Sequence, residues 1–227
     1  MFTAFALALG DAFAPTQRRA LVLSLVLALL LLAGLWVAAT ALVTAIHVSG
    51  LPGIDTFVHV FGSLAALVVA WLLYPAMTML VLGFFLDRVI EAIERAHYPG
   101  QPPARRIGTG EAVASALRLA LVSLVLNLVV LPLYLVPGLN LVLYYALNGY
   151  LVGREYFELI AMRRVDRRAL RALWRWRRGE LTLAGAIVAV LLSLPFVNLV
   201  APLVGAAFML HLFERLRRAA PARITSV

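Results

Sequence analysis

Two long apolar segments stand out in the first half of the chain. Residues 20–48 and residues 56–86 contain no acidic or basic side chain apart from a single histidine in each. A helix needs about 20 apolar residues to cross the hydrocarbon core of a bilayer, and a helix over 20–48 would be about 43 Å long. We therefore predict two long transmembrane helices. Pro75 should kink the second, because proline removes one backbone hydrogen bond.

Two further pairs of apolar helices are shorter and are joined by turns rich in proline. The first pair occupies 111–158 around the turn at 131–140, and the second occupies 181–213 around the turn at 194–202. Their charge-free arms hold only 11 to 15 residues each, fewer than a spanning helix requires. We predict two re-entrant helical hairpins that penetrate the membrane partly. Their turns then need a polar interior or protein contacts.

Three flanking segments complete the predicted architecture. Residues 163–178 place apolar side chains on one helical face and arginines elsewhere, which is typical of an amphipathic helix at the membrane surface. Residues 1–19 predict an interfacial helix, with a cleaved signal peptide as the alternative, although residues 1–14 lack the basic residues of such a signal. Residues 214–227 form a basic tail. The predicted fold is an all-α integral membrane protein with one membrane domain, residues 1–227.

Composition favours the same class. Hydrophobic residues make up 63% of the chain, above the proportion usual in soluble domains. The absence of cysteine excludes disulfides and thiolate metal sites.

The distribution of charge predicts an orientation in the membrane. The formal net charge is +9, and all 20 basic residues are arginines. They fall within residues 1–19, 87–118, 154–180 and 214–227, and none lies in the three turns between helices. The positive-inside rule therefore predicts that both termini are cytoplasmic. Six spanning helices would give the same sidedness, and helix length favours two spanning helices with two hairpins. Nucleic-acid-binding proteins usually carry a basic patch on a polar soluble domain, and the sequence predicts no such patch. We therefore expect that nucleic acid is not a partner.

A basic motif precedes the first long helix. Thr16 is predicted to be the N-cap, so Arg18 and Arg19 fall in the first turn, where the helix dipole disfavours cations. Free backbone N–H groups at a helix start bind anions, and arginine adds paired donors. Thr16, Gln17, Arg18 and Arg19 are thus candidate ligands of a tetrahedral oxyanion. The alternative is that the arginines only orient the helix.

Polar residues also occur at predicted membrane depth. Arg118 interrupts an apolar arm, and ionisable residues in such positions usually face the bundle interior or water. Its side chain could instead reach the membrane surface. Four amides could line a polar pathway or form hydrogen bonds between helices. These candidate pathway amides are Asn127, Asn140, Asn148 and Asn198.

No constellation in the sequence predicts an enzyme, a metal or a cofactor. The histidines are scattered without the spacing of metal ligands. They are His47, His59, His97 and His211. Asp87, Glu91 and Glu94 share a helical face, and we interpret them as a solvated helix end. A serine hydrolase would need Ser123 or Ser193 beside His211, which nothing in the spacing predicts.

The order of these elements resembles the CysZ-type sulfate permeases, within the etoposide-induced membrane protein family. The resemblance covers nearly the whole chain and rests on three features: residues 17–19 before a long helix, the turn at 131–140 with its return arm, and residues 194–202. It implies an inner-membrane helical protein that assembles as oligomers and admits sulfate for cysteine synthesis. The family's Gly-x-Arg-Arg sulfate site corresponds to residues 16–19, with threonine in place of glycine.

The predicted function is therefore a permease or channel for sulfate or a similar oxyanion in the bacterial inner membrane, supplying cysteine biosynthesis. The expected partners are the anion, the lipid bilayer and further copies of the chain. The alternative is a non-transporting scaffold that organises other membrane proteins. Sulfate uptake by the purified protein separates the two functions.

Overall fold

A computed structural model of the chain describes residues 1–45, 52–105, 107–136, 138–194 and 197–221. These residues form seven α-helices and two short 3-10 helices, with no β-strand in the described ranges. The predicted all-α fold is confirmed. His47, residues 49–51 of the predicted turn at 49–56 and the end of the basic tail lie outside the described residues. The rest of that turn, from Pro52, belongs to a helix.

The helices fall into two compact units. The long-helix unit comprises Pro15–Val89, and the bundle unit comprises Met1–Ala14 together with Ile90–Val227. The long-helix unit holds the two long apolar segments, and the bundle unit holds both hairpins.

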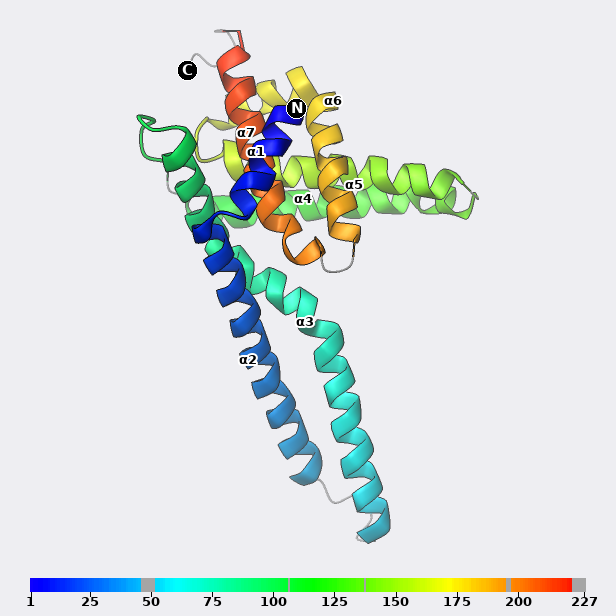
Figure 1. Ribbon diagram of the computed structural model, residues 1–227. Coiled ribbons are helices and arrows are strands. Elements are labelled where there is room, and N and C mark those ends of the chain that lie inside the picture. Colours follow the sequence, from blue (N-terminus) through cyan, green and yellow to red (C-terminus); the bar gives the residue numbers. More distant parts are fainter. Residues whose placement is uncertain (46–51, 106, 137, 195–196, 222–227) are drawn as a thin grey trace. The chain divides into compact units, whose positions relative to one another are not determined.

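The long-helix unit is an antiparallel pair of helices. It contains α2 (Pro15–Ala45) and most of α3 (Pro52–His97). Residues Gln17–Ala45 and Gly53–Tyr74 are apolar and long enough to cross a membrane. The indole Nε1 of Trp36 in α2 donates to the backbone carbonyl of Ser63 in α3, 3.2 Å away. Figure 1 shows that α3 changes direction partway along its length, as expected for a helix with an internal proline.

Both long helices begin before their predicted first residues. Because α2 begins at Pro15, residues 15–19 belong to the first long helix and not to the interfacial helix before it, α1 (Phe2–Ala12). The second long helix begins at Pro52, before the predicted start at residue 56, and its predicted polar extension over residues 87–96 is present and ends at His97. Its last turns, from Ile90, belong to the bundle unit.

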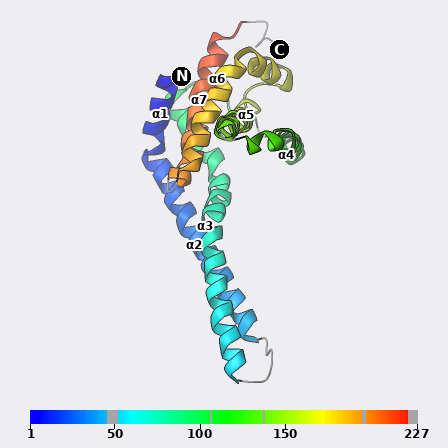
Figure 2. The ribbon, with the colours of Figure 1, turned by 90° about the vertical axis from the view of Figure 1, so that its right-hand side faces the viewer.

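The bundle unit is built around its last helix. α7 (Ala201–Ala219) is buried along most of its length and packs against α1, α5 (Leu139–Ala161) and α6 (Arg167–Ser193). Its first six residues beyond the predicted hairpin, 214–219, continue the helix into the basic tail. Figure 2 shows α4 (Thr109–Val130) and α5 nearly end-on, running across α6 and α7.

The first hairpin consists of α4, the 3-10 helix η1 (Leu131–Leu135) and α5. Gly138 precedes α5 with a φ of 81°, a left-handed conformation that favours glycine and reverses the chain. Residues Thr109–Tyr134 are long and apolar enough to cross a membrane in spite of Arg118. Helix length therefore does not decide whether this hairpin crosses fully, and its partial depth stays a prediction.

The second hairpin shares a helix with the basic segment that precedes it. The predicted surface helix 163–178 and the predicted arm 181–194 are joined in α6, and Arg177 departs from helical geometry between them (φ −128°, ψ 30°). The side chain of Asp166 caps the N-terminus of α6 by accepting a hydrogen bond from the backbone N–H of Ala169 at 2.7 Å. The short 3-10 helix η2 (Val197–Leu199) then leads into α7.

The end of α3 is solvated only in part, because Asp87 and Glu91 are exposed as predicted but Glu94 is buried. Glu94 is only 6% exposed, and its carboxylate contacts two arginines from the loop between α5 and α6. Oε2 of Glu94 lies 2.6 Å from Arg164 and 3.9 Å from Arg163. A buried carboxylate needs cationic partners, because burying an isolated charge costs roughly several kcal/mol of desolvation free energy.

Candidate functional site

A cavity rich in arginine opens between α4, α5 and α6 of the bundle unit. Its volume is about 540 Å³. Six arginines and a single carboxylate line it, together with two aromatic rings and two aliphatic side chains. The lining residues are Arg118, Leu119, Val122, Tyr150, Arg154, Glu158, Arg168, Arg171, Trp174, Arg175 and Arg178.

Most of the arginines come from one face of α6. Arg168, Arg171, Arg175 and Arg178 follow one another at separations of three and four residues, which places them on one side of a helix. The apolar positions between them, such as Leu170 and Leu173, are buried against the rest of the unit. The same amphipathic pattern that docks α6 therefore turns its arginines toward the cavity.

Arg154 and Glu158 form the opposite wall and are held in place by several contacts. The two side chains form an ion pair one helical turn apart on α5. The hydroxyl of Ser115 on α4 donates to the other carboxylate oxygen of Glu158 at 2.6 Å, which ties α4 to α5. The guanidinium of Arg154 lies 4.9 Å from the centre of the Trp174 ring. This cation–π contact fixes its orientation.

The cavity carries a large excess of positive charge. Its one carboxylate is already paired with Arg154. Within the described ranges, the other five arginines of the cavity form no ion pair with any acidic residue. Like charges that converge without counter-ions raise the local concentration of anions. Guanidinium groups also donate paired hydrogen bonds that match the oxygens of sulfate or phosphate. The arrangement is thus suited to binding an oxyanion.

The structure brings only one of the predicted pathway residues into this cavity. Arg118 lines it, in keeping with one of its two predicted positions, since ionisable residues in apolar helices usually face water or the bundle interior. Asn127 and Asn148 instead donate to backbone carbonyls one turn earlier in their own helices, at 2.8 and 2.9 Å. Asn140 accepts from the backbone N–H of Leu141, and Asn198 lies in η2. None of the four amides lines the cavity, and their role in a pathway stays a prediction.

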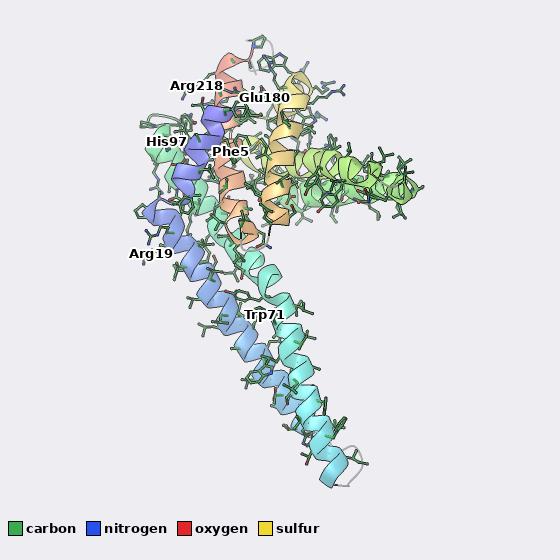
Figure 3. The ribbon with its side chains drawn as sticks, turned by 45° about the vertical axis from the view of Figure 1, so that its right-hand side comes forward. Phe5, Arg19, Trp71, His97, Glu180 and Arg218 are labelled. Carbon is green, nitrogen blue, oxygen red and sulfur yellow. The ribbon has the colours of Figure 1, made fainter. Side chains whose placement is uncertain are left out.

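The predicted oxyanion motif lies in the other unit, at the start of α2. Because α2 begins at Pro15, Thr16 is inside the helix and is not its N-cap. Gln17 is buried, and its side-chain oxygen has no hydrogen-bond partner among the described residues. Arg18 and Arg19 are exposed, and neither forms an ion pair within the described part of the chain. Figure 3 shows Arg19 near the start of α2. Anion binding by residues 16–19 stays a prediction.

Sequence reasoning missed the arginines of α6 as site residues. It assigned residues 163–178 to a membrane surface, where arginines would only contact lipid and water. The spacing of Arg168, Arg171, Arg175 and Arg178 was visible, but the helices that close over them come from residues 118–122 and 150–158. A local pattern cannot report which distant helix faces it.

Comparison with known proteins identifies a family. Residues 4–202 match the family model described as sulfate transporter CysZ/etoposide-induced protein 2.4. No curated protein matches the chain.

Proposed function

The chain belongs to the sulfate transporter CysZ/etoposide-induced protein 2.4 family, and from this premise we propose that it is a sulfate permease of the bacterial inner membrane that supplies cysteine biosynthesis. Its helices long enough to cross a membrane make it a membrane protein of that transporter family.

The arginine-lined cavity is the observation that carries this proposal. Five guanidiniums without an acidic partner in the described residues can exchange water for the oxygens of a dianion. Because these side chains are largely exposed, each contact should contribute only about 1 kcal/mol or less. Several weak contacts suit a permease, since conduction requires binding that is strong enough to admit the ion and weak enough to release it.

Arg18 and Arg19 are proposed as a second point of contact with the anion. They carry positive charge at the beginning of a helix whose residues can cross the membrane. With all arginines on the cytoplasmic side, both termini would be cytoplasmic, and the two arginines would meet sulfate at that membrane face. The two sites lie in different compact units and can be tested separately.

Assembly into oligomers is part of the same proposal. α4 has no buried residue along its 22 residues, although most of its side chains are apolar. Lipid or a second copy of the chain must therefore cover it. Contact with a second copy would also bury the polar atoms of the turn at η1, as a re-entrant hairpin requires.

Uptake of labelled sulfate into proteoliposomes tests the function. We expect uptake well above that of empty liposomes, and a loss of about tenfold or more in Arg171→Gln/Arg175→Gln, because two of the cavity's charges are removed. Arg18→Ala and Arg19→Ala test the proposed capture site in the same assay. Arg95→Gln is the matched control, since Arg95 is an exposed arginine that does not line the cavity.

Two results would contradict the proposal. Uptake no faster than in empty liposomes would favour the non-transporting scaffold. Uptake that is equal in the wild type and in every arginine variant would remove both sites from the transport path.

Addition of high salt should slow uptake by the wild type, because salt screens exposed charges.

A further inference from the structure

Three side chains that commonly bind metals meet in the bundle unit. Asp11 lies near the end of α1, His97 is the last residue of α3, and His211 lies within α7. Their ligand atoms all lie within 4.8 Å of one another. The three residues come from the beginning, the middle and the end of the sequence, and Figure 3 shows His97 beside α1.

The carboxylate of Asp11 bridges the two imidazoles. Its Oδ1 lies 2.8 Å from Nε2 of His97, and its Oδ2 lies 2.7 Å from Nε2 of His211. A tetrahedral ion with bonds of about 2.0–2.1 Å holds its ligand atoms about 3.3 Å apart. The two contacts of Asp11 are thus about half an ångström shorter than in such a site, and the widest separation in the cluster, up to 4.8 Å, is longer. Small side-chain rotations that open the first and close the second would admit an ion between the three groups.

The second nitrogen of the buried histidine already has a partner. The hydroxyl of Tyr98 lies 2.7 Å from Nδ1 of His211. Metal-bound histidines typically bond to an outer partner through the ring nitrogen that is not on the metal, which fixes the ring and its tautomer. In the structure, Nε2–H of His211 donates to Asp11, and Nδ1 accepts from the Tyr98 hydroxyl. On metal binding, the ring proton would lie on Nδ1 and be donated to the Tyr98 oxygen, which would leave the lone pair of Nε2 for the ion.

Exposure differs across the cluster in a way that allows an ion to enter. The side chain of His97 is 33% exposed, that of Asp11 is 13% exposed and that of His211 is 1% exposed. His211 therefore forms a rigid base, and His97 forms the outer edge next to solvent. Water can complete a fourth coordination position on that side.

The donor types point to one class of metal. Two imidazole nitrogens and one carboxylate oxygen suit zinc and neighbouring divalent transition metals. Calcium and magnesium prefer sites made of oxygen donors. The chain contains no cysteine, so no thiolate can join these ligands, and the site offers only nitrogen and oxygen donors.

We propose that Asp11, His97 and His211 bind a divalent transition metal ion of the zinc class, which fastens α1 to α7 and to the end of α3. α1 is a short helix of 11 residues that otherwise docks through small buried alanines and an edge contact between Phe5 and Phe208, with ring centres 5.2 Å apart. A metal would strengthen the docking of this segment. The site stands independently of sulfate transport.

Metal binding by the purified full chain tests the proposal. The protein carries a tag without histidine, is stripped with a chelator, and is titrated with Zn²⁺ by calorimetry. We expect about one ion per chain. Asp11→Asn and His97→Gln should each weaken binding at least tenfold, since each removes a ligand. His59→Gln is the matched control, because His59 lies in the long-helix unit. This variant should bind zinc as tightly as the wild type.

A second measurement uses the cobalt ion. Co²⁺ bound to the wild type should show the visible absorption of a four-coordinate nitrogen and oxygen site, and His97→Gln should lose it. Because His97 is exposed, this variant should fold even if changes at the buried His211 do not. Substoichiometric zinc in the wild type, or zinc binding by Asp11→Asn and His97→Gln that is as tight as in the wild type, would overturn the proposal. The cluster would then be a network of hydrogen bonds alone.

Discussion

Arginine has two different roles among the residues of the bundle unit. Arg163 and Arg164 are nearly buried and contact the carboxylate of Glu94, so they hold the α5–α6 loop against the end of α3. Arg171 and Arg175 line the open cavity and have no acidic partner in the described ranges. The first kind contributes to stability through desolvated ion pairs, and the second kind is available to an anion.

The buried carboxylate should matter more for stability than its exposed neighbour. Glu94→Gln keeps the shape of the side chain and removes the charge that Arg163 and Arg164 contact. We expect a loss of about 3 kcal/mol or more in the free energy of unfolding, because buried guanidinium charge loses its compensation. Denaturant titration in detergent micelles measures this loss.

Glu91→Gln provides the comparison. Glu91 also contacts Arg163, at 3.5 Å, but its side chain is 54% exposed. Its replacement should cost less than about 1 kcal/mol, as for other exposed ion pairs. Equal losses in the two variants would mean that burial does not determine the strength of these contacts.

Among the elements, α5 and α6 cross in close backbone contact. Gly149 and Gly153 on α5 are four residues apart and face Gly185 on α6. A Cβ atom at Gly153 would lie 2.5 Å from the carbonyl oxygen of Leu181, and one at Gly185 would clash with the backbone of Gly149. Small residues at such spacing allow the backbones of membrane helices to pack directly. This crossing positions Arg154 opposite the arginines of α6.

Adding one methyl group at the crossing should separate the helices. Gly185→Ala is expected to destabilise the protein by about 1–3 kcal/mol, since a well-packed crossing has no room for it. Gly179→Ala, in the same helix, has no atom within 4 Å of the added group. It should be neutral or slightly stabilising, because alanine restricts the unfolded chain more than glycine does. Thermal unfolding in detergent compares the two, and a stable Gly185→Ala protein would contradict the packing.

At the scale of the whole molecule, the arrangement in the membrane can be tested chemically. The chain has no cysteine, so single cysteines can be labelled without background. Gly53→Cys, near the connection between α2 and α3, should react with an impermeant maleimide from outside the cell. Asn198→Cys, in the turn of the second hairpin, should stay protected from that side, because its arms are too short to cross.

Ala220→Cys, directly after the end of α7, serves as the internal control. It should react only in inverted vesicles, since the arginine distribution predicts that this end is cytoplasmic. Strong labelling of Asn198→Cys from outside would mean that the second hairpin spans the membrane. External labelling of Ala220→Cys would overturn the predicted orientation as a whole.

The sequence by itself determined the features that depend on neighbouring residues. Apolar runs and their lengths predicted the all-α membrane fold and the two long helices, because the hydrophobic thickness of a bilayer sets the length that a helix needs. Proline-rich turns located the breaks between shorter helices. The Gln17–Arg19 motif and the order of the hairpins indicated the family, which the match over residues 4–202 confirmed.

Only the tertiary structure decided which distant residues meet. Glu94 was interpreted as solvated and is buried, since its partners lie about 70 positions away along the chain. Arg118 and Arg154 face the arginines of α6, and Asp11 meets His97 and His211, although no spacing in the sequence relates them. Helical periodicity in the sequence predicts which face of its own helix a side chain occupies. The packing of whole helices, through the glycine crossing and the burial of α7, determines what that face contacts.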